Sequence, residues 1–442
     1  MNPKALVLAV LSATVLFTIS CQQGAQPPAP EVDPHAEAVR LAHEVLMVDT
    51  HIDLPYRLKE KMEDISVRTE DGHFDVVRAR EGGLDAAFMS IYVPPSLQEE
   101  GGARELADEL IDLVESIAAD SPEDFAVARS VPETRALFEE GIFALPMGIE
   151  NGGAIEDDIA ALQHFYDRGV RYITLSHSEP NLICDSSYAT NRPWNGLSPF
   201  GREVVAEMNR LGIMVDVSHV TDDTFYQAIE ISKAPMIASH SCCRHFTPGF
   251  ERNMTDDMIV RLAEAGGVIQ IAFAPGFLTE AAQKQSSDLW AKMREYMQEH
   301  EVAMGSPEFM QQMALYYEEN PKVETSVSDV ADHIEHIREV AGVEHVGLGG
   351  DFDGISSVVV GLEDVSTYPG LLEELSRRGW TEEELRMLAG ENILRVMREA
   401  EAAARRIQRV RPPSMKTIEE MDRIVGEEEG EVEADAPLEN AV

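Results

Sequence analysis

The chain has 442 residues, and its 36 Lys and Arg residues are outnumbered by 80 Asp and Glu residues, giving a formal net charge of −44 at pH 7. A charge of this size is repelled at long range by a phosphate backbone or an anionic lipid surface, which argues against nucleic acid or a bare membrane as a partner. The hydrophobic fraction of 44% is typical of a globular protein and argues against disorder over the whole chain.

The first 20 residues predict a signal peptide. Lys4 is followed by an apolar run over residues 5–19, which is shorter than the roughly 20 residues that span a membrane. The run ends at Ser20 and Cys21, a pattern that resembles the lipobox of bacterial lipoproteins, in which the cysteine is lipidated. We therefore expect a lipid anchor at Cys21 as the only membrane link, on a bacterial cell envelope facing the periplasm or exterior. The alternative is a plain secretory signal with an incidental cysteine.

Composition also divides the rest of the chain. Residues 21–35 are rich in proline and predict a tether, and residues 36–405 carry the periodic patterns of one folded domain. Residues 406–442 end in a strongly acidic stretch and predict a disordered tail. The folded part contains three cysteines, Cys184, Cys242 and Cys243, too few and too poorly spaced for a disulfide scaffold or a zinc–thiolate site.

Eight short apolar runs alternate with amphipathic segments in the folded part. They are rich in Val, Ile, Phe and Tyr, as strands buried on both faces should be. The runs cover residues 46–48, 86–93, 143–149, 170–175, 213–217, 235–238, 268–273 and 346–348. This alternation predicts an α/β protein with a (β/α)8 TIM-type barrel. A doubly wound open sheet is the alternative, although the chain has no glycine-rich phosphate-binding loop.

The connection after the seventh predicted strand, residues 274–326, is unusually long. Helical patterns at 289–297 and 309–317 lie inside it. Such an insertion between the seventh strand and the seventh helix of a barrel either covers the active site or forms a packing subdomain, and the sequence leaves both alternatives open. Further on, Thr381 and Glu384 have capping-box spacing, and residues 381–405 predict a pair of closing helices.

Histidines and carboxylates follow six of the eight predicted strands. Because a barrel gathers the carboxyl ends of its strands at one face, these side chains should converge there. Imidazole and carboxylate groups suit a divalent zinc ion in a hydrolytic site. Asp49 and Asp216 have a structural alternative, as acceptors for turn amides. Asp332, His333 and His336 predict a solvated helix face.

The folded part contains a series of short motifs in a fixed order. They are VDTHIDLP at 48–55, GIENG at 148–152, TLSHS at 174–178, VDVSH at 215–219, SHS at 239–241, ERNM at 251–254 and GGDFDG at 349–354. Together these motifs resemble the renal (membrane) dipeptidase family, metallo-dipeptidases of the amidohydrolase superfamily. The resemblance runs from about Ala36 to Ala400.

The resemblance implies a site with two zinc ions per chain, bridged by Glu150 and a hydroxide. It makes His51 and Asp53 ligands of the first zinc, and His219 and His240 ligands of the second. It also gives three residues a role in catalysis or substrate binding. Asp351 resembles the acid/base, His177 the residue that contacts the substrate carbonyl, and Arg252 the residue that holds the substrate carboxylate.

The function expected from this resemblance is zinc-dependent hydrolysis of dipeptides, L-D dipeptides among them, by an enzyme whose family suggests homodimers. An N-acyl-amino-acid hydrolase or a lactonase could use the same metal site, but a carboxylate-binding Arg252 favours the dipeptidase. A non-catalytic envelope solute-binding lipoprotein is the distant alternative, and it would not need convergent histidines. Mammalian family members have a C-terminal glycolipid anchor and disulfides, and neither is readable in this sequence.

Overall fold

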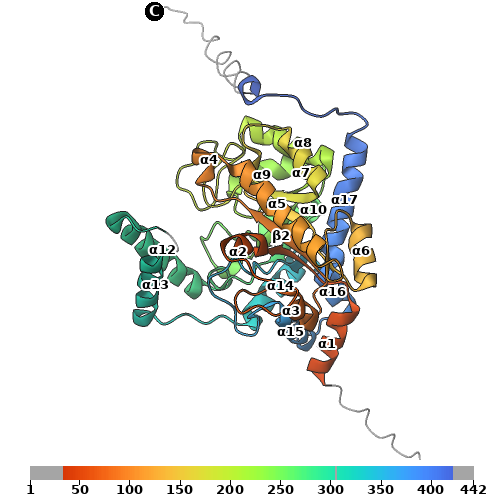
Figure 1. The fold of residues 1–442 in the computed structure, drawn as a ribbon, viewed down its shortest axis with the longest axis vertical. Coiled ribbons are helices and arrows are strands. Elements are labelled where there is room, and N and C mark those ends of the chain that lie inside the picture. The colour runs from red at the N-terminus through yellow and green to blue at the C-terminus, as the bar shows by residue number, and fades with distance from the viewer. Residues whose placement is uncertain (1–32, 304–305, 422–442) are drawn as a thin grey trace, which may run out of the picture. The chain divides into compact units, whose positions relative to one another are not determined.

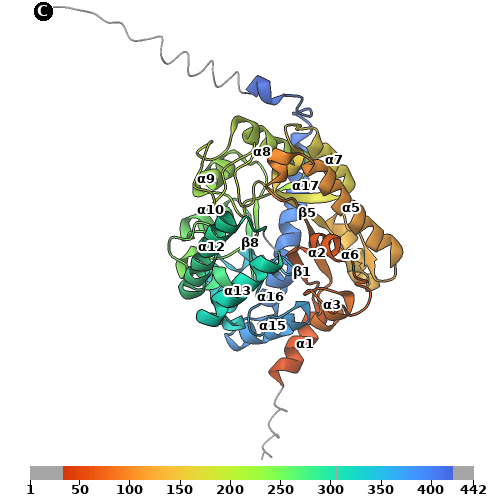
Figure 2. The ribbon, with the colours of Figure 1, turned by 60° about the vertical axis from the view of Figure 1, so that its left-hand side comes forward.

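Eight parallel strands close into a barrel within the described part of the chain, residues 33–303 and 306–421 of a computed structural model (Figures 1 and 2). The order around the barrel is β1, β2, β5, β6, β7, β8, β9 and β10, and β1 pairs with both β2 and β10 to close it. The predicted (β/α)8 fold is confirmed. The barrel strands are β1 Val48–Ile52, β2 Ala86–Tyr92, β5 Met147–Glu150, β6 Val170–Thr174, β7 Met214–Asp216, β8 Ile237–Ser241, β9 Val268–Ile271 and β10 Val346–Leu348.

Two shorter strands, β3 (Phe125–Ala126) and β4 (Phe143–Ala144), extend the sheet outside the barrel next to β2. The sequence predicted a single strand over 143–149, and this prediction is wrong. Pro146 has no backbone N–H to donate, and the run is divided there into β4 and the barrel strand β5.

Helices surround the barrel, as Figure 2 shows with β1, β5 and β8 at its centre. Among the described residues no helix is long and apolar enough to span a membrane. The helices are α1 Pro34–Glu44, α2 Leu54–Glu60, α3 Val76–Gly82, α4 Leu97–Glu100, α5 Ala103–Asp120, α6 Val131–Glu140, α7 Ala161–Arg168, α8 Pro199–Leu211, α9 Asp222–Ile231, α10 Asp256–Glu264, α11 Pro275–Leu278, α12 Glu280–His300, α13 Pro307–Glu319, α14 Val327–Val340, α15 Tyr368–Arg377, α16 Glu382–Arg386 and α17 Asn392–Ile407.

Helix α17 closes the amino-terminal end of the barrel. Its buried residues Ile393, Val396 and Met397 form one apolar cluster with Val48 and Ile237 at the starts of β1 and β8. The predicted pair of closing helices is a nearly continuous run from α16 through a π-helical turn, Met387–Glu391, into α17. The capping box at the start of α16 is present as the sequence predicted.

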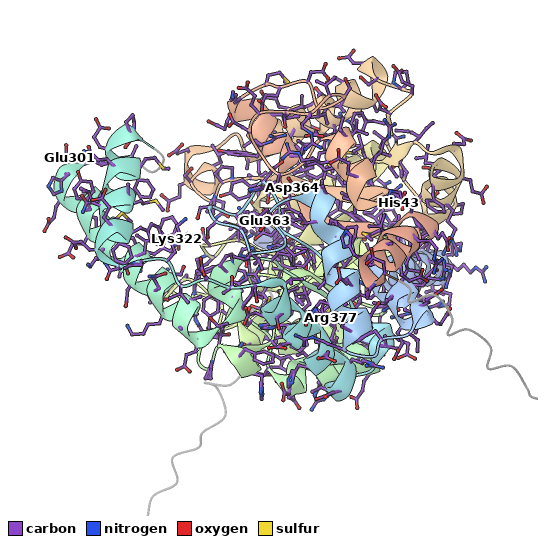
Figure 3. The ribbon with its side chains drawn as sticks, turned by 90° about the horizontal axis from the view of Figure 1, so that it is seen from below. His43, Glu301, Lys322, Glu363, Asp364 and Arg377 are labelled. Atoms are coloured by element: carbon purple, nitrogen blue, oxygen red, sulfur yellow. The ribbon has the colours of Figure 1, made fainter. Side chains whose placement is uncertain are left out.

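The predicted insertion forms α11, α12 and α13. The last two pack on each other through a small apolar cluster of their own, formed by Leu289, Met293, Phe309 and Tyr316. Figure 1 shows this helix pair projecting from the barrel on the side opposite α17. In Figure 3, Glu301 lies at the far end of the projection and Lys322 nearer the barrel.

Parts of both chain ends lie outside the described residues. The predicted signal peptide, most of the predicted tether and the acidic stretch of the predicted tail fall in residues 1–32 and 422–442, outside the described residues. The expected boundary at residue 405 lies within α17, which ends at Ile407. Beyond it, Lys416 donates to Glu203 at 2.9 Å and the Met421 side chain is buried.

Candidate metal centre

The structure brings the predicted ligands together at the carboxyl ends of the barrel strands. Of the five predicted ligands, none is more than 7% exposed. Their ligand atoms fall into overlapping groups, each within 4.8 Å, that also include His177 and Asp351. The residues are His51 on β1, Asp53 directly after it, Glu150 at the end of β5, His177 three residues after β6, His219 three residues after β7, His240 on β8, and Asp351 three residues after β10.

The two oxygens of Glu150 face different histidines. Its Oε2 atom is 3.5 Å from His51 Nε2, whereas its Oε1 atom is 3.1 Å from His219 Nε2 and 3.5 Å from His240 Nε2. Burial opposes ionisation of Glu150, but the facing histidines hold the pKa of this carboxyl well below its ordinary value. One carboxylate therefore offers a separate oxygen to each of two neighbouring positions.

The hydrogen bonds of His51 determine which ring nitrogen is free. The Tyr172 hydroxyl donates to the Thr50 carbonyl at 3.1 Å, so it must accept from His51 Nδ1 at 2.9 Å. His51 Nε2 then keeps a lone pair, and it lies 3.4 Å from Asp53 Oδ2 with no hydrogen-bond partner among the described residues. The Tyr172 ring can occupy this place because residue 148 is glycine, where a Cβ atom would lie 2.1 Å from the ring.

A similar chain of hydrogen bonds orients His240. The Ser239 hydroxyl donates to Asp216 Oδ2 at 2.6 Å, so it accepts from His240 Nδ1 at 2.9 Å. His240 Nε2 then carries a lone pair, and this atom lies 2.8 Å from His219 Nε2. Metal-ligating histidines commonly donate their other ring N–H to such a partner, which fixes the tautomer and the ring orientation.

The electrostatics of the centre favour a cation between these rings. Burial, together with the nearby positive groups, holds the pKa of His219 and of His240 well below the ordinary value, so both rings are neutral, as a metal ligand must be. Burial would also lower the pKa of His51, yet the hydroxyl of Tyr172 and the carboxylates of Asp53 and Glu150 raise it well above the ordinary value. The same carboxylates that favour a proton on His51 Nε2 favour a divalent ion there.

The donor set therefore fits a divalent metal. Three imidazole nitrogens and the oxygens of two carboxylates converge here, and neutral imidazole with carboxylate suits zinc. The Ser90 hydroxyl also donates a long hydrogen bond to Glu150 Oε2, at 3.3 Å.

Two aspartates follow β10, and only one faces the centre. Asp351 groups with His51 and His240, and its backbone N–H donates to the His51 carbonyl at 3.0 Å. Burial, and the repulsion of the Asp53 and Glu150 carboxylates, raise the pKa of Asp351 well above the ordinary value.

Asp353 instead has structural partners. Its Oδ1 atom accepts from the His73 backbone N–H at 2.6 Å, and its Oδ2 atom lies 3.1 Å from Arg57 Nε. Both Asp351 and Asp353 have positive φ angles, 62° and 67°, so the chain turns sharply at each and separates the directions of the two side chains.

His177 and Arg252 lie beside the ligands. His177 Nε2 is 3.6 Å from Glu150 Oε1, and its ring centroid is 4.4 Å from that of His219. Arg252 lies between β8 and α10 and is 3% exposed. Its guanidinium donates from Nη1 to Ser241 Oγ at 2.7 Å and from Nη2 to the His240 carbonyl at 2.6 Å, which places a fixed positive charge next to the ligands.

Asp49 and Asp216 have the structural role that was the alternative for them. Asp216 Oδ1 accepts from the backbone N–H groups of Ser218 and Ser239, at 3.1 and 2.8 Å. Asp49 accepts from the backbone N–H groups of His51 and Gly350, at 2.7 and 2.9 Å. Both carboxylates tie adjacent strand ends together.

The prediction of a solvated helix face is wrong for His333. This residue is fully buried, its Nδ1 accepts from the Cys243 N–H at 3.0 Å, and its Nε2 donates to the Leu278 carbonyl at 2.9 Å. Burial lowers its pKa to about 4, so the ring is neutral and joins α14 to the end of β8.

The sequence reasoning missed Tyr172 and Ser239, which orient His51 and His240. Tyr172 lies in the middle of an apolar run, where nothing in the pattern separates a residue inside the barrel from one outside. A signal existed for Ser239, because a hydroxyl directly before a ligand histidine can reach its Nδ1 atom.

Comparisons with known proteins identify one family. The family model described as membrane dipeptidase, peptidase family M19, matches residues 35–411. A dipeptidase of Schizosaccharomyces pombe is 35% identical over 382 residues, which cover 82% of this chain and 83% of the yeast protein. Dipeptidase 3 of Mus musculus is 34% identical over 376 residues, covering 83% of this chain and 66% of the mouse protein.

Solved structures show the same relationship. The probable dipeptidase PvdM of Pseudomonas aeruginosa has a TM-score of 0.74 at 27% identity, covering 84% of this chain and 99% of the other. A metallo peptidase of Rhodobacter sphaeroides, liganded with a phosphinate mimic of the dipeptide L-Ala-D-Ala, has a TM-score of 0.66 at 26% identity, covering 80% and 99%. This chain therefore belongs to the membrane dipeptidase family and is a metallo-dipeptidase with a (β/α)8 barrel.

Proposed function

We propose that this enzyme hydrolyses dipeptides, L-D dipeptides among them, with two zinc ions held by His51 and Asp53 on one side of Glu150 and by His219 and His240 on the other. The observation that carries the proposal is the position of Glu150, whose two oxygens face these two sets of ligands separately. The ligand of the Rhodobacter sphaeroides structure, a mimic of L-Ala-D-Ala, supports the inclusion of L-D dipeptides.

Bound in this centre, two zinc ions would supply an activated water and polarise the carbonyl of the scissile bond. Asp351 takes the proton of the attacking water and delivers it to the leaving amine. Its carboxyl lies in one group with His51 and His240, which places it beside the proposed metal positions. His177 donates a hydrogen bond to the substrate carbonyl oxygen, where negative charge develops.

Arg252 binds the free carboxylate of the substrate. Its guanidinium is held by the end of β8, next to His240, so the carboxylate it binds lies close to the reacting carbonyl. This short separation limits the substrate to one residue beyond the scissile bond. A carboxylate-binding arginine also favours a dipeptidase over an N-acyl-amino-acid hydrolase or a lactonase.

We also propose that the enzyme is exported by the segment 1–20, anchored through a lipid at Cys21 and tethered over 21–35 to the bacterial cell envelope, and that it forms homodimers. The first part is tested by mass spectrometry of the mature N-terminus, where an unlipidated Cys21 would contradict it. Light scattering of the purified chain tests the second.

The main experiment measures the metal content of the purified enzyme and its hydrolysis of dipeptides with L and D residues at both positions. We expect two zinc ions per chain, cleavage of L-L and L-D dipeptides, and no cleavage of the same dipeptides with amidated C-termini. A metal-replete enzyme inert on every dipeptide would contradict the proposal, and cleavage of amidated substrates would contradict the role of Arg252.

Asp351→Asn should lower kcat by about 10²- to 10⁴-fold while both metal ions are retained, because the variant removes the proton carrier. Asp353→Asn is the matched control two residues away. It should keep kcat and lower the free energy of unfolding, because it weakens the ion pair with Arg57. Loss of metal from Asp351→Asn would make Asp351 a ligand instead.

A further inference from the structure

A second group of metal-ligating side chains lies outside the barrel centre. It consists of His245 on the 3-10 helix η2 (Arg244–Phe246), Asp256 at the start of α10 and His336 on α14, and we refer to it as the His245 cluster. One ring nitrogen of each histidine and one oxygen of Asp256 lie within 4.8 Å of one another. No residue of this group belongs to the barrel centre.

His336 contacts both other members of the cluster. His336 Nε2 is 2.8 Å from Asp256 Oδ1, and the rings of His245 and His336 stack with their centroids 4.4 Å apart and an interplanar angle of 27°. The two stacked imidazoles and the Asp256 carboxylate thus form one compact group of ligand atoms, in which the carboxylate supplies negative charge.

The backbone holds this arrangement in place. His333, one helical turn before His336 on α14, accepts a hydrogen bond from the backbone N–H of Cys243, two residues before His245. The Phe246 ring packs against both His333 and His336, with centroids 4.5 and 5.6 Å apart. The two histidines of the cluster are therefore carried by segments that are fixed to one another.

The chemistry of the group selects a class of ion. A tetrahedral ion with bonds of about 2.1 Å separates its ligand atoms by about 3.4 Å, so a modest rotation of the exposed His245 ring completes the site. Two imidazoles and one carboxylate suit zinc and copper(II) and do not suit calcium or magnesium, which prefer oxygen ligands. The net charge of the chain also favours a cation.

We propose that the His245 cluster is an additional divalent transition-metal site, of the zinc or copper(II) class, with water completing the coordination. The ion is bound by both ends of the segment 245–256 and by α14. This segment carries Arg252, so occupancy closes a short loop next to the substrate-binding arginine. The bound ion stabilises the folded chain by linking these segments, and it has no part in the proposed hydrolysis.

The test counts zinc beyond that in the barrel. Enzyme with its barrel metals in place, measured beforehand, is titrated with zinc in a calorimeter. We expect one further saturable equivalent per chain in the wild type. It should be lost in His245→Ala and in His336→Asn, and kept in His300→Ala, which removes an exposed histidine of α12 far from the cluster. The exposure of His245 makes its variant safe for folding.

Two readouts identify the site. Copper(II) bound in place of the added zinc should show nitrogen hyperfine coupling from two imidazoles in electron paramagnetic resonance, and the coupling should weaken in either histidine variant. The Tm of the wild type should rise with added zinc and that of His245→Ala should not, because an ion stabilises the state that binds it.

The proposal is overturned if the wild type and the His245→Ala/His336→Asn variant bind the same number of added zinc ions. It is also overturned if the bound copper(II) shows no imidazole nitrogen. Because the barrel metals and dipeptide hydrolysis are measured before the titration, either result leaves the proposed function unaffected.

Discussion

The positions of two hydroxyl hydrogen atoms determine which ring nitrogens of His51 and His240 face the barrel centre. Tyr172 and Ser239 each give their own hydroxyl hydrogen to another acceptor, a carbonyl or a carboxylate. Each can then only accept from the neighbouring histidine, so His51 and His240 turn their Nε2 lone pairs inward. Tyr172 and Ser239 thus determine the tautomers of His51 and His240.

Tyr172→Phe removes the acceptor for His51 Nδ1 while keeping the ring that fills the space beside Gly148. The affinity for the ion at His51 and Asp53 should fall by about 10- to 100-fold, the usual cost of losing such a partner. Competition with a chelator measures this affinity. Tyr226→Phe, which loses an exposed hydrogen bond to Asp257, is the control. Equal affinities in the two variants would show that Tyr172 does not orient His51.

At the residue scale, the sequence could predict which side chains converge but could not separate their directions. The strand-end rule brings both Asp351 and Asp353 to one face of the barrel. The positive φ angles that turn one toward the ligands and the other toward Arg57 arise from tertiary contacts. His333 was misjudged because helical spacing alone does not show what covers a helix, and here the segment after β8 does so.

At the scale of elements, the two ends of the barrel differ in the kind of side chain they contain. The carboxyl ends of the strands carry the polar side chains of the candidate metal centre, whereas the amino-terminal end of the barrel is filled by the apolar face of α17. The alternation of strands and helices was predictable because each element buries a periodic apolar pattern. The division of residues 143–149 at Pro146 and the two-residue β3 were missed, since elements this short carry almost no periodic signal.

Met397→Ala opens a cavity between α17 and the barrel floor. The side chain is 2% exposed, so the free energy of unfolding should fall by about 2–5 kcal/mol. Metal content and kcat should stay unchanged, because the ligands lie at the other end of the strands. Urea denaturation tests the first expectation and metal analysis the second. Met310→Ala on α13, where the side chain is 56% exposed, should shift stability by no more than about 0.5 kcal/mol.

At the scale of the whole molecule, the net charge of −44 has no evident partner in the reaction. A dipeptide with one amino and one carboxylate group is neutral overall, so the global field neither attracts nor repels it strongly. The charge is then a property suited to the surroundings of the enzyme, and it points to a salt-rich environment in which self-repulsion is screened.

Raising sodium chloride from about 0.1 M to about 1 M shortens the Debye length from about 10 Å to about 3 Å, so the free energy of unfolding should rise at pH 7. Near the sequence pI of about 4.5 the same salt step should have a smaller effect, because little net charge remains to be screened. Thermal denaturation at the two pH values measures the difference. Stability independent of salt at pH 7 would contradict this interpretation of the charge.

Strand β10 completes the barrel. Without it, β1 and β9 would each have an edge with no neighbouring strand. Its three residues, Val346–Leu348, pair with both, and the Asp351 N–H reaches the His51 carbonyl across the seam. Asp351 therefore reaches His51 and His240 only in the closed barrel, so a chain truncated before β10 would keep all five proposed ligands and lack the proposed proton carrier.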